Sequence, residues 1–267
     1  MDFDHKRIVI TGAASGIGQA LLQQLAQYDT HILAADINGG RLLQTVTDLA
    51  KTPARLESFV ADLSGQEAVD RLFNEAVQKM GGVDIFFANA GFPYYERLGK
   101  PDWQHIDDIF RLNVIAIIYS LEKMQALNRG RDFRMVVTAS AMAQIAMPAY
   151  ALYSGTKAAI DRFAEGLRFE LEDPRQLVMV YPIATRTNFF NAANTQHPPP
   201  VPWPSQTPRA VAKAALRGVL HNHKTVYPSF LYRVMQLLDR FLPFSRRIYQ
   251  GIALQQFIRW EQSDHQE

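Results

Sequence analysis

The sequence predicts a single doubly wound α/β domain, in which helices cover both faces of a mostly parallel sheet. Apolar runs bounded by turn residues alternate along the chain with longer stretches of helical periodicity. Several runs are apolar throughout, which is typical of parallel strands that are covered on both faces. Strand and helix alternating in this way predict right-handed crossovers, and a length of 267 residues suits one domain of this class.

The patterns place the elements along the chain. Strands are expected at residues 7–11, 31–35, 56–60, 83–88, 133–138 and 177–181. Helices are expected near residues 16–28, 40–51, 66–80, 102–128 and 150–172. Residues 188–208 interrupt the alternation with six prolines, which predicts a long irregular connection. Because loops of this length are usually functional, we expect this segment to be a substrate loop.

The composition excludes several classes of protein. A charged fraction of 20% and a hydrophobic fraction of 48% are ordinary for a globular chain, and the net charge of +2 gives no basic field for nucleic acid. The chain has no cysteine, so it has no disulfide, no thiolate catalysis and no cysteine-bound metal. The histidines are scattered, and His221 and His223 are expected in a surface turn, so no metal site is predicted. Neither a secretory signal nor a membrane-spanning segment is visible, and a cytoplasmic location is expected.

A glycine-rich turn follows the first expected strand. Gly12, Gly16 and Gly18 have the spacing Gly-x3-Gly-x-Gly, and a helical pattern follows at once. Glycine lets the backbone approach a pyrophosphate, and the start of a helix offers free N–H groups and a favourable dipole. The alternative is a tight strand-to-helix connection that binds nothing.

Asp36 ends the second expected strand. A carboxylate at this position can accept both hydroxyls of an adenine ribose, and it repels a 2′-phosphate. Ile37 and Asn38 follow, so no basic residue lies directly beside it, and NAD is favoured over NADP. The alternative is that Asp36 is only a helix cap or turn residue.

Tyr153 and Lys157 are four residues apart in an expected helix, so they project from the same helical face. A lysine ammonium near a phenol is expected to lower the phenol's pKa from its ordinary value of about 10, which would let the tyrosine exchange a proton with an alcohol. Ser140 lies at the carboxyl end of a strand, where a doubly wound sheet opens into its ligand crevice. Taken singly, each residue also has a structural explanation, as a partly buried tyrosine, a solvated lysine or a capping serine.

These motifs stand in the order typical of the short-chain dehydrogenase/reductase family, which the chain resembles from about Lys6 to Thr187. The motifs are the glycine-rich turn, Asp36, Asp62, the run Asn89-Ala90-Gly91, Asn113, Ser140 and Tyr153-x3-Lys157. The length and the glycine spacing resemble the compact subtype of the family. The resemblance implies a Rossmann-like fold with a mostly parallel seven-stranded sheet, and a homodimer or homotetramer. It also implies hydride transfer between nicotinamide and a secondary alcohol or ketone.

The resemblance implies a role for each matching residue. Tyr153 would be the general acid/base, and Lys157 would lower its pKa and bind the nicotinamide ribose. Ser140 would hold the substrate oxygen, and Asn113 would support a proton relay through water. The residues implied to bind the cofactor are Gly12, Ser15, Gly16, Ile17, Gly18, Asp36, Ile37, Asp62, Leu63, Asn89, Ala90, Gly91, Tyr153, Lys157, Pro182, Thr185 and Thr187.

The expected substrate is an apolar alcohol or ketone. The residues expected to line its pocket are Phe92, Pro93, Met142, Met147, Phe189, Phe190 and Trp203, with Ser140, Met142, Tyr153 and Phe189 binding it. Ile183 replaces the glycine that the family has after the sixth strand, which is expected to reshape the nicotinamide pocket. Two alternatives stay open, an NADP-preferring carbonyl reductase and a catalytically silent dinucleotide-binding regulator, although a regulator would not need the full catalytic set.

The end of the chain is expected to form an extension of amphipathic helices, residues 229–267, after a catalytic domain of residues 1–228. Residues 209–267 carry nine basic and four acidic side chains, whereas residues 1–208 carry 19 and 22. Apolar residues recur at helical spacing over 230–242, and Pro243 is expected to end that helix. The helices either pack on the body or on a partner subunit and close the substrate loop, or they make peripheral contact with an anionic membrane.

Overall fold

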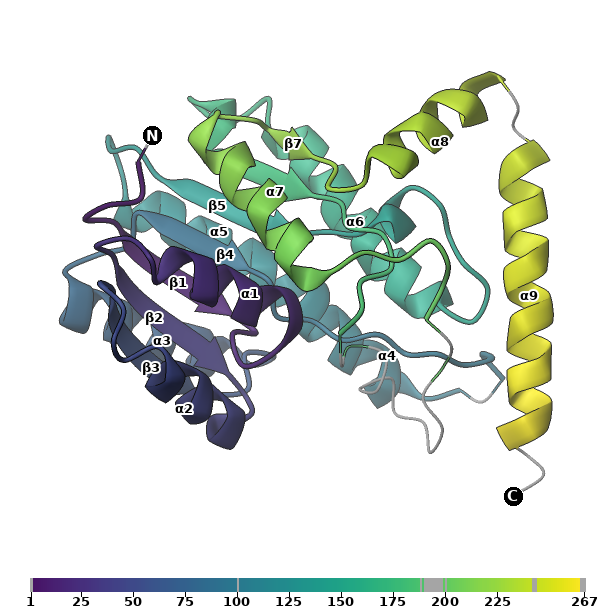
Figure 1. Cartoon of the computed structure of the whole chain (residues 1–267), viewed down its shortest axis with the longest axis horizontal. Coiled ribbons are helices and arrows are strands. Elements are labelled where there is room, and N and C mark those ends of the chain that lie inside the picture. The colour runs from purple at the N-terminus through teal and green to yellow at the C-terminus, as the bar shows by residue number, and fades with distance from the viewer. Residues whose placement is uncertain are drawn as a thin grey trace.

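The structure is a computed structural model that describes residues 2–99, 101–187, 189, 199, 201–241 and 244–264, with backbone alone at 238–241, 244–245 and 263–264. Within these residues, seven parallel strands form one sheet in the order β3-β2-β1-β4-β5-β6-β7 (Figure 1). The strands are β1 (Arg7–Thr11), β2 (His31–Asp36), β3 (Arg55–Val60), β4 (Ile85–Ala88), β5 (Arg134–Thr138), β6 (Leu177–Val180) and β7 (Thr225–Val226). The predicted doubly wound fold is confirmed, and the sheet is parallel throughout.

The helices are α1 (Gly16–Leu25), α2 (Gly39–Asp48), α3 (Gln66–Met80), α4 (Trp103–Phe110), α5 (Ala116–Leu127), α6 (Ala151–Leu167), α7 (Pro208–Leu220), α8 (Phe230–Phe241) and α9 (Phe244–Asp264). The single helix expected near 102–128 is interrupted between α4 and α5 by a π-helical turn, Arg111–Ile115. The sequence patterns did not predict α7. It begins at the last proline of the expected loop, because Pro208 needs no N–H at the first helical position and Thr207 caps the helix.

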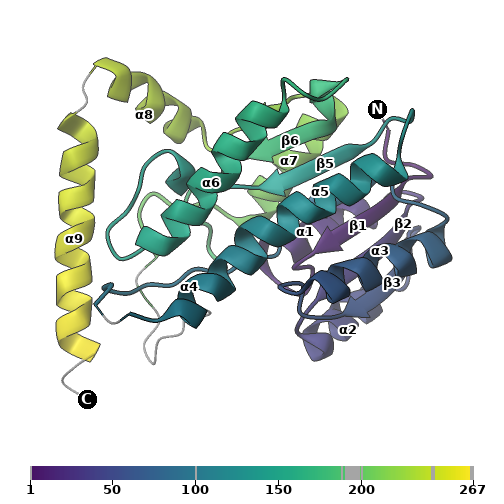
Figure 2. The same ribbon diagram turned by 180° about the vertical axis from the view of Figure 1, so that it is seen from behind.

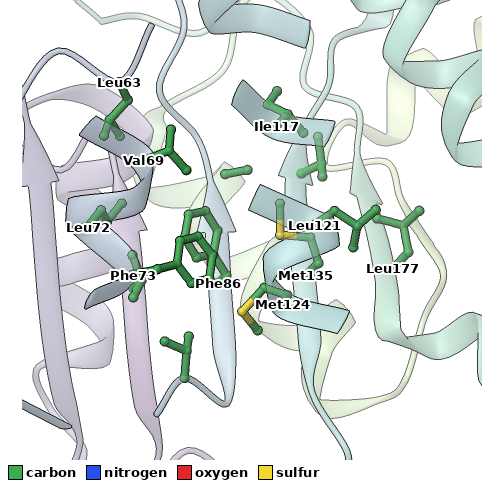
Figure 3. Close-up of a cluster of buried hydrophobic side chains, with 14 of the residues drawn as sticks. Leu63, Val69, Leu72, Phe73, Phe86, Ile117, Leu121, Met124, Met135 and Leu177 are labelled. Carbon is green, nitrogen blue, oxygen red and sulfur yellow. The ribbon is translucent and has the colours of Figure 1, made fainter. Parts of the chain in front are cut away.

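The sheet is buried on both faces. Helices α3, α5 and α6 pack on one face, and α1, α2 and α7 pack on the other (Figures 1 and 2). Alternate side chains of β4 enter each layer, so that Phe86 packs under α3 and Phe87 under the opposite helices. Figure 3 shows Phe86 beside Phe73 of α3, and the two rings stack with centroids 5.3 Å apart.

Asn89 ties three central strands together at the carboxyl edge of the sheet. Its Nδ2 donates to the backbone oxygens of Thr11 (3.2 Å) and Gly12 (3.4 Å), and its Oδ1 accepts from Thr138 Oγ1 (3.1 Å). The backbone N–H groups of Asn89 and Ala90 both donate to Thr11 Oγ1 at 3.0 Å. These bonds fix the start of the glycine-rich turn against the ends of β4 and β5.

Helices α8 and α9 lie at the end of the molecule opposite β3 and α2 (Figures 1 and 2). Their inner sides pack on the body. Phe257 of α9 is 3% exposed, and Gln250 Nε2 donates to the backbone oxygen of Ala146 at 2.7 Å. Arg97 forms a two-point ion pair with Glu261 of α9, with distances of 2.9 and 2.8 Å. No helix in the described ranges is both long and apolar enough to cross a bilayer.

Replacing Phe86 by alanine is expected to lower the free energy of unfolding by about 3–5 kcal/mol, because a buried, stacked ring is lost and a cavity remains. The matched control is Phe169→Ala, since that ring is 89% exposed, and its effect should stay within about 0.5 kcal/mol. Urea unfolding followed by circular dichroism measures both variants. Equal losses in the two would contradict the assignment of Phe86 to the core.

Candidate active site

A cavity of about 620 Å³ opens at the carboxyl edge of the sheet. It lies where the crossovers on the two sides of β1 and β4 turn in opposite directions, which is the usual ligand crevice of a doubly wound sheet. Most of the residues predicted to bind a cofactor line it: Gly12, Ser15, Gly16, Ile17, Asp36, Ile37, Asp62, Leu63, Asn89, Ala90, Gly91, Tyr153, Lys157, Pro182, Thr185 and Thr187. Gly18 and Asn113 do not line it.

The glycine-rich turn is too tightly folded for larger residues. Gly12 and Gly16 have φ of 67° and 57°, and a Cβ on Gly18 would lie 2.0 Å from the carbonyl oxygen of Gly12. Helix α1 begins at Gly16, and Ser15 at its N-cap makes no side-chain capping bond. The first N–H groups of α1 are therefore not satisfied by a capping side chain and, with the helix dipole, favour an anion such as a pyrophosphate.

Asp36 is held firmly at the adjacent loop. Its two carboxylate oxygens accept from the backbone N–H groups of Ala14 and Asn38, both at 2.9 Å. The N-cap of α2 is Asn38, whose side chain accepts from the N–H of Arg41, so Asp36 is a turn residue and not the helix cap. Its carboxylate also lines the cavity, and the geometry fits a ribose as well as a turn.

The segment after β6 closes the same end of the cavity. Thr187 packs over Gly16, with its Cγ2 3.0 Å from where a Cβ on that glycine would lie. The hydroxyl of Thr185 donates to the backbone oxygen of Ile183 at 2.9 Å, so it is engaged within the segment. Thr185 also bridges to Gln206, which joins the far end of the proline-rich segment to the site.

Ser140, Tyr153 and Lys157 come together on one wall of the cavity, and each is under 9% exposed. Lys157 Nζ donates to the backbone oxygen of Thr138 at 2.9 Å and lies 5.6 Å from the centre of the Tyr153 ring. The Ser140 hydroxyl is hydrogen-bonded to the side chain of Tyr153 and accepts from the N–H of Met142 at 3.0 Å. The serine therefore both caps a helical turn and contacts the phenol.

Burial dominates the ionisation of this wall. It raises the pKa of Tyr153 above the ordinary value for a phenol, and the hydrogen bond from Ser140 offsets only part of that rise. The net direction is opposite to the lowering that the Tyr-x3-Lys spacing predicted. Burial also lowers the pKa of Lys157 to about 8, because its ammonium is desolvated.

Asn113 lies behind the cavity wall in the π-helical turn, and its side chain is fully buried. Its Nδ2 donates to Phe92 O (2.9 Å) and Thr156 Oγ1 (3.2 Å), and its Oδ1 accepts from Phe92 N (3.2 Å). A Cβ on Gly91 would lie 2.8 Å from Asn113 Oδ1 and 3.8 Å from Lys157 Nζ, so both side chains flank this glycine. π-helical turns of this kind occur frequently at functional sites.

The substrate side of the cavity is largely apolar and aromatic. Of the residues predicted to line it, Phe92, Met142, Met147 and Phe189 do so, and the Phe189 ring lies 5.5 Å from that of Tyr153. Trp203 was also predicted to line it, but its side chain is 80% exposed, and Pro93 is buried elsewhere. Phe190 lies outside the described residues.

Sequence reasoning missed several lining residues: Tyr94, Ile145, Tyr150, Tyr232, Met235 and Tyr249. Tyr150 stands one turn before Tyr153, and that spacing could have indicated it. Tyr232 and Met235 belong to α8 and Tyr249 to α9, and no local pattern says which side of those helices faces the cavity. Within the described ranges, no group of three His, Asp or Glu side chains is arranged to hold a metal ion.

The comparisons with known proteins agree on one family. A family model described as short chain dehydrogenase matches residues 6–198. Estradiol 17-beta-dehydrogenase 11 of Rattus norvegicus is 26% identical over 237 residues, which cover 88% of this chain and 79% of that protein.

Two solved structures share the fold. A short chain dehydrogenase/reductase from Burkholderia phymatum in complex with NAD has a TM-score of 0.81 and 21% identity, covering 91% of this chain and 95% of that one. A short-chain dehydrogenase from Sphingobium yanoikuyae in complex with NADPH has a TM-score of 0.72 and 19% identity, covering 88% and 94%. The matched family model, together with the motif order and the site, shows that the chain belongs to the short-chain dehydrogenase/reductase family and is an oxidoreductase.

Proposed function

We propose that the chain is an NAD-dependent enzyme that moves a hydride between nicotinamide and a secondary alcohol or ketone of an apolar substrate, with Tyr153 as general acid/base. The observation that carries the proposal is the convergence of Tyr153, Ser140 and Lys157 on one wall of a largely apolar cavity. Two similar proteins support the proposal. One is named as a dehydrogenase of estradiol, which is an apolar alcohol, and the other is a solved structure in complex with NAD.

The residues at the other end of the cavity fit a dinucleotide. The N–H groups of the glycine-rich turn would hold its pyrophosphate, and Asp36 would accept from the adenine ribose. Asp62 and Leu63 would border the adenine, and Lys157 would reach the second ribose. When bound, the nicotinamide supplies the hydride chemistry.

The protein supplies position and a proton. In alcohol oxidation Tyr153 takes the hydroxyl proton while Ser140 donates a hydrogen bond to the substrate oxygen, and in reduction Tyr153 returns the proton. Burial opposes the phenolate form of Tyr153, and the single Ser140 proton is given to the substrate oxygen. The phenolate would therefore be stabilised by the Lys157 ammonium, which lies over the ring. Both Asn113 N–H groups are already engaged, and its Oδ1 accepts one bond from Phe92 N–H, so the second lone pair of Oδ1 would accept from a water in a proton relay.

Tyr153→Phe is expected to reduce turnover at least about 10²-fold and to leave NADH binding nearly unchanged, because only the exchangeable proton is lost. The matched control is Tyr150→Phe, a buried tyrosine that lines the same cavity and lies one turn earlier. Steady-state turnover and NADH fluorescence titration measure the two effects. Near-normal turnover in Tyr153→Phe would exclude the mechanism.

NADP is the second candidate cofactor, and one observation favours it. A groove next to the glycine-rich turn is lined by Ser15 and by three arginines, Arg41, Arg186 and Arg209. Arg41 stands on the first turn of α2, three residues beyond Asn38, and is exposed. Arg41 therefore offers a positive charge near the place where a 2′-phosphate would lie. The residues that directly follow Asp36, Ile37 and Asn38, carry no charge.

Asp36→Ala is therefore expected to raise KM for NAD and to reduce the preference of the enzyme for NAD over NADP. The reason is that the substitution removes both the acceptor for the ribose hydroxyls and the negative charge. Arg41→Ala is the paired variant and should affect NADP alone. Kinetic constants for both cofactors, on a panel of secondary alcohols and ketones, measure the preference. Unchanged constants in Asp36→Ala would mean that its carboxylate only holds the turn.

Lys157→Met is expected to change how stability depends on pH. Burial lowers the pKa of Lys157 to about 8 from the ordinary 10.5, so between these values the unfolded chain binds a proton that the folded protein has lost. The stability of the wild type relative to Lys157→Met therefore rises with pH through this window. Urea unfolding at about pH 7 and about pH 9.5 measures it, with the exposed Lys51→Met as control. If the difference in unfolding free energy between the wild type and Lys157→Met did not change with pH, the lowered pKa of Lys157 would be contradicted.

Three further parts of the proposal concern the whole chain. Residues 1–228 form the catalytic domain and residues 229–267 extend it, and the enzyme works in the cytoplasm as a homodimer or homotetramer. Contact between copies would use the helical stretches near residues 102–128 and 150–172, where Ile115 of the π-helical turn is an exposed apolar side chain. The helices of the extension would also make a peripheral membrane contact. A silent dinucleotide-binding regulator is the remaining alternative, and turnover with either cofactor would exclude it.

A further inference from the structure

Helix α8 exposes large apolar side chains on the side that faces away from the protein. On its inner side, Tyr232 OH donates to Gln144 Oε1 (3.0 Å), and Gln236 bonds the same oxygen. On the opposite side, Phe230 and Leu237 stand at positions i and i+7 and are 79% and 63% exposed. A surface helix ordinarily buries its apolar side and exposes its polar one. Two large apolar side chains exposed on one side of this helix indicate that another apolar surface covers that side.

Helix α9 also exposes apolar side chains. Its inner side carries the buried Phe257, which packs against Tyr95 with ring centroids 5.3 Å apart. Ile248 and Ile252, one turn apart on the outer side, are 59% and 52% exposed. We call the outer residues Phe230, Leu231, Leu237, Ile248, Ile252 and Ile258 the outer apolar face.

Among the described side chains, those with a charge around the outer apolar face are positive. Arg233, Arg247 and Arg259 are exposed on the two helices. Among the described side chains of residues 229–262, Glu261 is the one acidic residue, and it lies on the inner side, paired with Arg97. A second copy of the same face would add more arginines to the contact and, among the described outer side chains, no carboxylate to pair with them, because a two-fold contact repeats the same surface. An apolar layer covered by negative charge, as in an anionic bilayer, complements the face better.

The two helices also form part of the substrate cavity. Tyr232 and Met235 of α8 and Tyr249 of α9 line it, so the outer apolar face and the cavity are separated by the thickness of one helix. Tyr249 OH donates to the backbone oxygen of Trp203 at 3.1 Å, and the indole of Trp203 is 80% exposed beside this contact. A surface that rests on α8 and α9 would therefore lie next to a wall of the cavity.

We propose that the outer apolar face docks on the surface of an anionic lipid bilayer, from which an apolar substrate reaches the cavity along α8 and α9 (Figures 1 and 2). Docking requires no cofactor and no turnover. The route of the substrate rests on the proposed function, whereas docking does not.

The first experiment measures docking with no cofactor or substrate present. The full chain is floated with phosphatidylcholine vesicles that contain about 30% phosphatidylglycerol or none. We expect it to bind the anionic vesicles, and to lose at least about tenfold in partitioning on neutral vesicles or in about 0.5 M NaCl. The double variant Phe230→Gln, Leu237→Gln should lose about as much, with unchanged thermal stability and unchanged turnover of a small water-soluble ketone.

Matched controls separate the outer apolar face from exposed residues in general. Phe169→Gln changes a ring exposed to 89% outside α8 and α9 and should leave binding intact. Arg247→Gln, Arg259→Gln should weaken binding, whereas Arg129→Gln, Arg131→Gln, which removes exposed arginines after α5, should not. Lack of dependence on anionic lipid, or equal losses in the controls, would overturn the proposal.

A second copy of the chain is the competing occupant of the outer apolar face. Light scattering in the absence of lipid tests it by measuring the mass of the protein in solution. The proposal predicts the same mass for the wild type and for Phe230→Gln, Leu237→Gln. A smaller mass in the variant, without vesicle binding by the wild type, would show that the face joins two copies and would overturn docking on lipid. Vesicle binding by a chain that turns over no alcohol or ketone would leave docking standing and contradict the proposed function instead.

Discussion

The hydrogen bonds of Asn89 are the constraint on which the site depends. The carboxyl ends of parallel strands lie at one edge of the sheet. The loops that build the site extend beyond this edge, where strand pairing no longer fixes their backbone. Asn89 joins the end of β1 to Thr138 at the end of β5, and the backbone oxygen of Thr138 then accepts from Lys157. The glycine-rich turn and the lysine are therefore positioned by one continuous chain of hydrogen bonds. Both ends of the Asn89 amide are engaged in this way, which makes it a positioning residue.

The site combines strong burial with little internal charge compensation. Lys157 is 4% exposed, and the polar contact that holds it is a backbone oxygen, not a carboxylate. Burial lowers its pKa and raises that of Tyr153, so the protein alone disfavours the charged form of both groups. A lysine and a tyrosine in this state respond strongly to any charge that enters the cavity. The low polarity of the site makes the charged forms of Lys157 and Tyr153 unfavourable. It also strengthens the effect of a bound ligand's charge on their ionisation.

The fold and most of the candidate site could be predicted because their signals are local. Apolar strands, glycines at fixed spacing and Tyr153 four residues before Lys157 are all visible within short windows. Other features depend on distant contacts. The direction of the Tyr153 pKa shift follows from burial, and the rings of Phe189 and Tyr150 that pack near this tyrosine come from residues whose position the Tyr-x3-Lys spacing does not report. Trp203 was wrongly placed in the pocket because composition identifies an aromatic residue but not the direction of its side chain.

Helix α8 is hydrogen-bonded to the turn that follows Ser140. Tyr232 OH donates to the backbone oxygen of Ala141 (3.3 Å) and to Gln144 (3.0 Å), and Ala141 directly follows Ser140. The backbone N–H of Ala141 also donates to Pro182 O at 2.9 Å, so this short turn is held from both α8 and the segment after β6. The position of α8 and the position of the Ser140 hydroxyl are thus set by the same few bonds.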